Sequence, residues 1–220
     1  MIKPIEERVA VHAALADPTR LAIVEDLVAS DRSPSELARR FDVPGNLLAH
    51  HLDVLEGAGV VARFASAGDR RRRYVRLRHA TVAGMVRTAT PPPGSVLFVC
   101  THNSARSQLA AALWRARTGS PARSAGTHPA DHVHPGAVGA ARRAGLTLEA
   151  ARPRHLDPAE SADVVVTVCD RAHEELAVDA SWWHWSVPDP TSTATDAAFD
   201  AALTDLDHRI SNLLEASTSP

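Results

Sequence analysis

The sequence is poor in cysteine, and it contains no long apolar run. Only two cysteines, Cys100 and Cys169, occur among 220 residues. Two are too few for a disulfide scaffold, so we expect a reducing compartment in which thiols do chemistry. An apolar stretch of about 18 residues, which a membrane-spanning helix needs, is missing, and so is a signal-peptide pattern. We therefore expect a cytoplasmic protein with no membrane association.

The chain is long enough for two small domains, at roughly 100–200 residues for each. Residues 1–90 hold 14 basic and 11 acidic side chains, whereas residues 91–220 hold 10 and 15, so the halves have net charges of +3 and −5. Three consecutive prolines at 91–93 favour an extended spacer between the halves. We predict domains over residues 1–88 and 96–220, joined by a proline-rich linker at 89–95, with the basic first domain as the candidate for nucleic-acid binding.

The most informative segment, residues 96–107, runs from an apolar strand through Cys100 and a short polar loop into a helix. The N–H groups of such a loop and of the first helical turn lack intrahelical partners, so they can converge on a tetrahedral anion. The same field favours thiolate over thiol at Cys100, which makes it a nucleophile. The candidate oxyanion-binding residues are Thr101, His102, Asn103, Ser104, Ala105, Arg106 and Ser107. Arg106 offers a planar fork of donors to the oxygens, and the Ser107 hydroxyl is a candidate donor to the thiolate.

This Cys-x5-Arg-Ser loop resembles that of the low-molecular-weight phosphotyrosine phosphatases and of the arsenate reductases with the same fold. Three further blocks, at residues 124–127, 164–169 and 184–191, follow in the family's order, so the resemblance extends over about residues 95–215. It implies an α/β fold with a doubly wound parallel sheet and an active site at the carboxyl ends of the strands. It also implies that Asp189 faces this site and protonates the departing oxygen.

Phosphatase and reductase differ in the step that follows attack by Cys100. In a phosphatase water hydrolyses the phosphocysteine, whereas in a reductase a second thiol attacks the arsenate adduct and arsenite leaves. Cys169 ends an apolar strand pattern and matches the first resolving cysteine of the thioredoxin-linked arsenate reductases; the alternative is an inert buried cysteine. Their third cysteine is replaced by Leu176. The remaining routes are a Cys100–Cys169 disulfide reduced by thioredoxin, or attack by a small thiol such as mycothiol with a mycoredoxin.

Other departures from the family refine the expectation. Thr191 follows Asp189-Pro190, where phosphatases usually have Tyr or Trp for an aromatic substrate. Ala111 stands where some reductases have an acidic residue that helps to bind potassium, so we expect no potassium site. Residues 131–134 contain two histidines but no third well-spaced partner, so we assign no metal and expect no bound cofactor. The three tryptophans at 182, 183 and 185 either line the mouth of the site or end an apolar strand.

The first half contains a helix-turn-helix pattern. Apolar spacing predicts a helix over 6–15, and Asp17 with Pro18 predicts a cap for a second helix over 21–28. Two short helices follow at 33–41 and 46–56. Their inward-facing residues are expected to be Leu37, Phe41, Leu48, Leu52 and Leu55. Strand patterns at 60–64 and 72–78 then predict a β-hairpin wing.

Residues 16–20, the paired histidines before Leu52 and residues 55–60 resemble the arsenic-repressor (ArsR) family of winged-helix regulators. The resemblance implies a homodimer that binds double-stranded operator DNA with its recognition helices in successive major grooves. Candidates for groove contacts are Asn46, His50 and His51. Candidates for phosphate contacts are Arg70, Arg71, Arg72 and Arg73; the alternative for this run is a solvated hairpin.

The sequence does not identify a sensor for this regulator. Many relatives sense through cysteines before the recognition helix, and this chain has no cysteine before Cys100. Four alternatives stay open for the first domain: it responds to another ligand, it senses through histidines such as His12 or His79, it reports the state of the second domain, or it senses nothing. We predict a regulator fused to a thiol-dependent arsenate reductase. The alternatives are a tyrosine phosphatase fused to a regulator, and a transcription factor that senses an oxyanion or redox state without catalysis.

Overall fold

The computed structural model describes residues 4–83, 85, 94–148, 150–157, 159–160, 162–176 and 181–215. The chain divides into two compact units, one built mainly from residues before 84 and the other mainly from residues after 93. Most of the linker predicted at 89–95 lies outside the described residues, which include only Gly94 and Ser95 from it.

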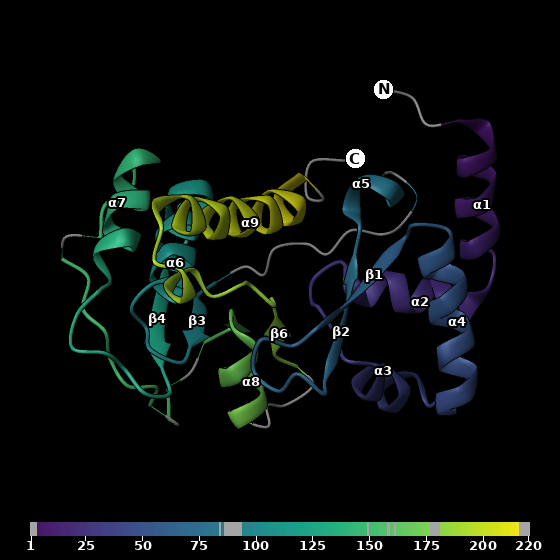
Figure 1. Cartoon of the computed structure of the whole chain (residues 1–220), viewed down its shortest axis with the longest axis horizontal. Helices are drawn as coiled ribbons and strands as arrows, with labels where there is room; N and C mark the ends of the chain where they lie inside the picture. The colour runs from purple at the N-terminus through teal and green to yellow at the C-terminus, as the bar shows by residue number, and fades with distance from the viewer. Residues whose placement is uncertain are drawn as a thin grey trace. The chain divides into compact units, whose positions relative to one another are not determined.

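The first unit combines helices with one β-hairpin (Figure 1). Its elements are α1 (Ile5–Leu15), α2 (Pro18–Leu27), α3 (Pro34–Phe41), α4 (Gly45–Gly57), β1 (Val61–Ala65), β2 (Arg73–Leu77) and α5 (His79–Val82). Helices α3 and α4 form the predicted helix-turn-helix. Strands β1 and β2 pair antiparallel, with Ala65 opposite Arg73 at the loop end of the hairpin.

Capping side chains begin two of these helices, and one of the two caps, Asp17, was predicted from the sequence. The Asp17 carboxylate accepts a 2.9 Å hydrogen bond from the Arg20 amide, and Pro18 occupies the first position of α2. Ser33 and Glu36 form a capping box before α3, with bonds of 2.6 Å from the Ser33 amide to the Glu36 carboxylate and 3.3 Å from the Glu36 amide to the Ser33 hydroxyl. These bonds satisfy amides that a helix start otherwise leaves unpaired.

The core of the first unit contains the apolar residues predicted from helical spacing. Leu37, Leu48, Leu52 and Leu55 are each at most 2% exposed. Phe41 is only partly buried and packs at the edge of the same cluster. The orientation of α4, and thus of its outer surface, is fixed by these leucines.

The second unit is an α/β domain with a four-stranded parallel sheet in the order β4-β3-β5-β6 (Figure 1). Its elements are β3 (Val96–Cys100), α6 (Arg106–Thr118), β4 (Ala122–Gly126), α7 (Pro135–Arg143), β5 (Val164–Thr167), α8 (Asp170–Leu176), β6 (Trp183–His184), the short 3-10 helix η1 (Pro190–Ser192) and α9 (Asp196–Glu215). Helices α6, α7 and α9 pack against one another, and α8 packs against β3 and β5. The predicted parallel α/β fold is confirmed.

Strand β3 lies at the centre of this domain, and each of its five residues is at most 3% exposed. Phe98 packs between Trp114 and Trp185, with ring centroids 6.0 and 5.8 Å away. Val99 pairs with Ala125 on one side and with Thr167 on the other. The carboxyl ends of β3 and β5 are therefore neighbours, which brings the segments after Cys100 and Thr167 to one edge of the sheet.

Candidate active site and candidate DNA interface

Cys100 is the last residue of β3, and its sulfur lies in the concavity of the loop that follows. The Asn103 amide donates to Cys100 Sγ at 3.2 Å, and Ser107 Oγ lies 3.0 Å from the same sulfur. Asn103 Nδ2 donates to Ser107 Oγ at 2.8 Å, so the hydroxyl oxygen is already an acceptor and its proton can point at Cys100. Two polar groups thus converge on Cys100 Sγ: the Asn103 amide, which donates to it, and the Ser107 hydroxyl, whose proton can point at it.

Asn103 shapes the loop from inside. Its backbone is left-handed, with φ of 48°, a conformation that asparagine tolerates better than most residues. Its side-chain oxygen accepts from the Arg154 amide at 3.0 Å and from Gln108 Nε2 at 3.2 Å. Asn103 is completely buried, so these bonds fix both the side chain and the turn that it makes.

The carbonyl groups of the loop are held by a second segment, residues 127–134. Four amides donate to four loop carbonyls over 2.8–3.1 Å: Thr127 to Cys100, His128 to Thr101, Ala130 to His102, and His134 to Ser104. With these carbonyls held by the second segment, the other amides of the loop and of the first turn of α6 can face an anion, while the Asn103 amide donates to Cys100 Sγ. Gly126 permits the close approach, since a Cβ there would lie 2.7 Å from the Thr101 carbonyl oxygen.

Arg106 begins α6, and its guanidinium is almost buried. Nη1 donates to the Val187 carbonyl at 3.1 Å, and Nη2 lies 2.9 Å from Asp189 Oδ2. The resemblance assigned Arg106 and Asp189 to the same crevice, and the structure places them in contact. The charge of Arg106 is thus held at the mouth of the loop.

Asp189 lies just before η1 and is partly exposed. Its Oδ1 accepts from the Thr191 amide at 3.0 Å and from the Thr191 hydroxyl at 2.8 Å. Desolvation by burial would raise the pKa of Asp189, but the positive charge of Arg106 and the two Thr191 bonds hold this pKa below its usual range. The carboxyl group is therefore ionised at neutral pH when the pocket holds no anion.

A small pocket opens between these residues. It is lined by Cys100, His102, Ser104, Ala105, Arg106, Asp189 and Thr191. Trp185, one of three tryptophans considered for the mouth, is instead 2% exposed and packed on Phe98. Among the described residues, none that lines this pocket has an indole or phenyl ring.

Cys169 lies two residues after the end of β5 and directly before α8. It is 1% exposed, its sulfur lies 3.4 Å from Thr101 Oγ1, and it accepts from the Ala172 amide at 3.4 Å. Burial raises the pKa of the Cys169 thiol, and the Arg106 charge opposes that shift only in part. Both cysteines are free thiols in this structure, and Thr101 connects the segments that contain them.

A buried polar cluster lies at the carboxyl end of β5. The Thr167 hydroxyl lies 3.0 Å from His173 Nδ1 and 2.9 Å from His184 Nδ1, and the two imidazole rings stack with centroids 4.1 Å apart. His184 Nε2 lies 3.0 Å from Asp170 Oδ1. Burial would raise the pKa of Asp170, but hydrogen bonds from His184 and Ser186 lower it. These contacts join β5, β6 and α8 behind Cys169.

Among the described residues, no group of three His, Cys, Asp or Glu side chains could hold a metal ion.

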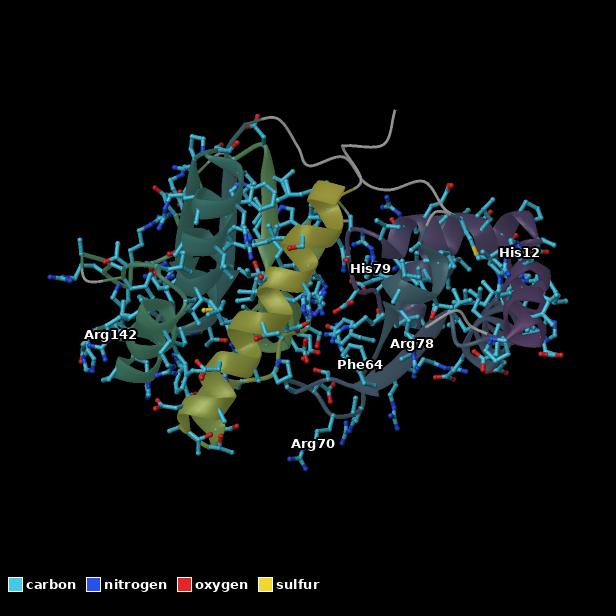
Figure 2. All side chains as sticks on the ribbon, turned by 90° about the horizontal axis from the view of Figure 1, so that it is seen from above. His12, Phe64, Arg70, Arg78, His79 and Arg142 are labelled. Atoms are coloured by element: carbon cyan, nitrogen blue, oxygen red, sulfur yellow. The ribbon has the colours of Figure 1, made fainter. Side chains whose placement is uncertain are left out.

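Two surfaces of the first unit contain predicted DNA-contacting residues. Asn46 and His50 are exposed on α4, and so is Leu47, which is 45% exposed. The four arginines of the hairpin, residues 70–73, are all exposed, and Figure 2 shows Arg70 projecting from the hairpin loop. The charges of the hairpin are thus accessible to a phosphate backbone.

The structure contradicts the prediction that His51 lies on the groove-facing surface of α4. It is 6% exposed, and its Nδ1 has no hydrogen-bond partner and lies 3.8 Å from Asp17 Oδ1. The reason is helical spacing, because His51 follows Leu48 by three positions and precedes Leu55 by four, which puts it on the core side of α4. It cannot contact a groove from this position.

Several residues of the sites were not predicted. Gln108 donates to the Asn103 carbonyl and side chain, and Arg154 contributes its amide to Asn103. Thr191 holds the Asp189 carboxylate, and Leu47 is an exposed apolar residue on the recognition helix. A signal existed for Gln108, a polar residue in the first turn of α6 directly before the apolar run at 109–114, and for Leu47, beside Asn46; the Arg154 amide gave none.

Comparison with known proteins agrees with this geometry. Residues 95–219 match the model of the low molecular weight phosphotyrosine protein phosphatases. The chain belongs to this family. Residues 15–63 match a helix-turn-helix domain, so the chain is a fusion of a helix-turn-helix domain with a domain of the phosphatase family.

Similar proteins include enzymes named for different activities. A Halobacterium salinarum protein named "Putative arsenate reductase" is 34% identical over 102 residues, which cover 42% of this chain and 72% of that protein. The tyrosine phosphatase Wzb from Escherichia coli K30, solved in complex with sulphate, is 25% identical with a TM-score of 0.50, over 55% of this chain and 96% of its own. A YwlE mutant from Bacillus subtilis shares the fold, at 23% identity and a TM-score of 0.50, over 57% and 99% of the two chains.

Within the described ranges, every helix is too short or too polar to span a membrane. This agrees with the absence of long apolar runs from the sequence.

Proposed function

We propose that the second domain is a thiol-dependent arsenate reductase and that the first is an operator-binding regulator. The observation that supports the reductase most strongly is the pair of thiols at the carboxyl ends of adjacent strands, with Thr101 Oγ1 3.4 Å from Cys169 Sγ and directly after Cys100. Hydrolysis of a phosphocysteine needs one thiol, whereas reduction of arsenate needs a second. The similarity to the Halobacterium protein supports the same substrate.

In the first step, the Cys100 thiolate attacks the arsenic of an arsenate bound by the loop amides and Arg106. A sulfur–arsenic bond forms and an arsenic–oxygen bond breaks. The oxygen, which already holds one proton, takes a second from Asp189 and leaves as water. Ser107 and the Asn103 amide stabilise the thiolate before the attack, and Thr101, His102, Ser104 and Ala105 complete the oxyanion-binding loop.

In the second step, the Cys169 thiol attacks Cys100 Sγ. A disulfide forms, the electron pair of the sulfur–arsenic bond passes to arsenic, and the thiol proton ends on an arsenite oxygen. Arsenic is thereby reduced by two electrons and the two thiols are oxidised. Thioredoxin, or mycothiol with a mycoredoxin, then restores the thiols.

The small-thiol route differs only in the attacking group. A molecule such as mycothiol would attack Cys100 Sγ through the pocket that Cys100 lines, although Cys100 is itself 3% exposed and Cys169 is 1% exposed. Cys169 would then be dispensable. Leu176, at the place of the third cysteine of thioredoxin-linked relatives, leaves both routes as candidates.

The first domain supports the proposal of DNA binding through two features. Asn46 and His50 are exposed on the second helix of the helix-turn-helix, and the exposed arginines 70–73 are suited to phosphate contacts. We propose that a homodimer formed by this domain places two such helices in successive major grooves. A regulator and an enzyme of arsenic resistance would then be made as one chain.

The deciding experiment is arsenite production from arsenate by the purified chain, with the thioredoxin system and the mycothiol/mycoredoxin system supplied in turn. Turnover with either supports the reductase and identifies its reductant. No arsenite with either system, together with hydrolysis of an aryl phosphate, would favour a phosphatase.

The phosphatase alternative is favoured by one observation, the family match with the similarity to Wzb, a tyrosine phosphatase. One residue argues against it: Thr191 follows Asp189-Pro190, where the resemblance to the phosphatases leads us to expect Tyr or Trp for an aromatic substrate. Inactivity in both assays, with oxyanion binding retained, would favour a sensor without catalysis.

A further inference from the structure

We propose that Thr191 is a positioning residue that fixes the Asp189 carboxylate so that Oδ2 holds the transferable proton. The inference rests on the proposed function, because it specifies how the acid of the first step is presented. Thr191 touches Asp189 and lines the pocket.

The two carboxylate oxygens of Asp189 have different partners. Oδ1 accepts both bonds from Thr191, the hydroxyl at 2.8 Å and the amide at 3.0 Å. Oδ2 lies 2.9 Å from Arg106 Nη2 and receives none of the Thr191 bonds. The carboxylate is therefore held by one oxygen and faces the arginine with the other.

Binding of an oxyanion changes only one of these oxygens. The anion takes the Arg106 charge, so Oδ2 loses its partner, while Oδ1 keeps two donors that disfavour a proton there. The proton is thus bound at Oδ2, beside the oxygen that leaves. When the sulfur–arsenic bond forms and the arsenic–oxygen bond breaks, this proton passes to the leaving oxygen and Asp189 returns to its carboxylate.

Other charged groups act on this carboxylate and must be considered in any pH experiment. Arg106 from α6 and His102 from the loop both favour the ionised form of Asp189 and lower its pKa. Cys100 lines the same pocket. Thr191 is the uncharged contributor among them, so its hydroxyl can be removed without changing the charge of the site.

The test uses hydrolysis of phenyl phosphate, whose poor leaving group needs a proton, followed across pH. In Thr191→Val we expect kcat to fall about tenfold, the loss typical of one hydrogen bond to a charged group, with little change in KM. The hydroxyl favours the ionised carboxylate, so its loss raises the pKa of Asp189 and moves the descending limb of the kcat profile to higher pH. Thr191→Ser keeps the hydroxyl and should restore both properties.

Ser192 offers a matched control. Its hydroxyl donates at 2.8 Å to the main-chain carbonyl of Asp189 and not to the carboxylate. Ser192→Ala should therefore leave kcat and the descending limb unchanged. An equal effect of Ser192→Ala and Thr191→Val would overturn the proposal, since both would then act through the stability of η1.

Asp189→Asn separates this inference from the proposed function. If Asp189→Asn keeps the wild-type kcat, the acid role of Asp189 is wrong and the proposed first step fails. If Asp189→Asn slows hydrolysis and Thr191→Val does not, only the role of Thr191 is overturned. Should the wild-type chain not hydrolyse the ester, carbon-13 titration of the Asp189 carboxyl group gives the same decision, with a higher pKa in Thr191→Val supporting the proposal and an unchanged one refuting it.

Discussion

The two units place their functional side chains in opposite environments. In the second unit Cys100, Asn103, Arg106 and Ser107 are buried, and most of their polar atoms are joined by hydrogen bonds of about 3 Å. In the first unit the candidate DNA contacts at residues 70–73 are exposed on a hairpin. A buried and interlocked site loses its function when one atom changes, whereas an exposed charged surface loses affinity in small increments.

Cys100→Ser should give the largest effect. Replacing the sulfur removes the nucleophile at nearly constant volume, so we expect arsenite formation and phosphate-ester hydrolysis each to fall by about a thousandfold or more. Both activities and thermal unfolding should be measured. Residual activity near the wild-type level in a folded variant would show that Cys100 is not the nucleophile.

Cys169→Ser should lower arsenite formation much more than phosphate-ester hydrolysis. We expect arsenite formation with thioredoxin to fall about a hundredfold, because the second step loses its thiol, while ester hydrolysis stays within about threefold. Parallel assays on one preparation provide the measurement. Equal losses would indicate that Cys169 supports the fold only, and full activity with a small thiol would establish the direct route to Cys100.

The arginine hairpin should show the graded behaviour expected of an exposed surface. Replacing Arg70, Arg71, Arg72 and Arg73 by Ala should lower operator affinity and flatten its salt dependence, by about 0.9 in the log–log slope for each phosphate that the protein no longer neutralises. Titrations at several salt concentrations give the slope. An unchanged slope would mean that the hairpin does not bind DNA.

Gly126→Ala tests how tightly the catalytic loop is held. Its Cβ would lie 2.7 Å from the Thr101 carbonyl oxygen and 3.0 Å from the Asn103 amide, so the loop must shift. We expect about a tenfold loss of activity with a loss of stability of about 1–3 kcal/mol. Gly57→Ala is the control, because nothing lies within 4 Å of its new Cβ; it should keep activity and raise helix stability slightly.

His50 and His51 should respond in opposite ways, although they are neighbours. His51→Ala removes a buried ring and should lower the free energy of unfolding of the first unit by about 1–3 kcal/mol. His50→Ala should leave stability within about 0.5 kcal/mol of wild type and weaken operator binding. Chemical denaturation and DNA titration separate the two effects, and a destabilised His50→Ala would refute the assignment of its exposed face.

Much of the fold follows from local patterns. The apolar run before Cys100 predicts a buried strand, and Asp17 lies where a helix cap is expected, because these features depend on residues close in sequence. The spacing of Leu48, Leu52 and Leu55 also fixes the core side of α4. Applied strictly, that spacing would have excluded His51 from the DNA surface.

The sequence predicted the residue types of the candidate site, but it did not predict the contacts among these residues. The segment that begins with Cys100 provides nucleophile, amides and Arg106 from consecutive positions, so a sequence pattern can identify it. The Arg154 amide reaches Asn103 across 51 positions, and Thr191 reaches Asp189 through a turn whose geometry depends on η1. Such contacts require the tertiary structure, because no local rule predicts which backbone amide meets a distant side chain.

The ion pair between Arg106 and Asp189 has a consequence for anion selectivity. With no ligand in the pocket, the guanidinium already has a carboxylate tethered beside it, and a tethered group competes at a high effective concentration. A halide ion, which has one centre of charge and cannot span the loop amides and the arginine together, competes poorly with that carboxylate. A tetrahedral oxyanion offers several oxygens at once, so we expect it to displace the carboxylate where simple anions do not.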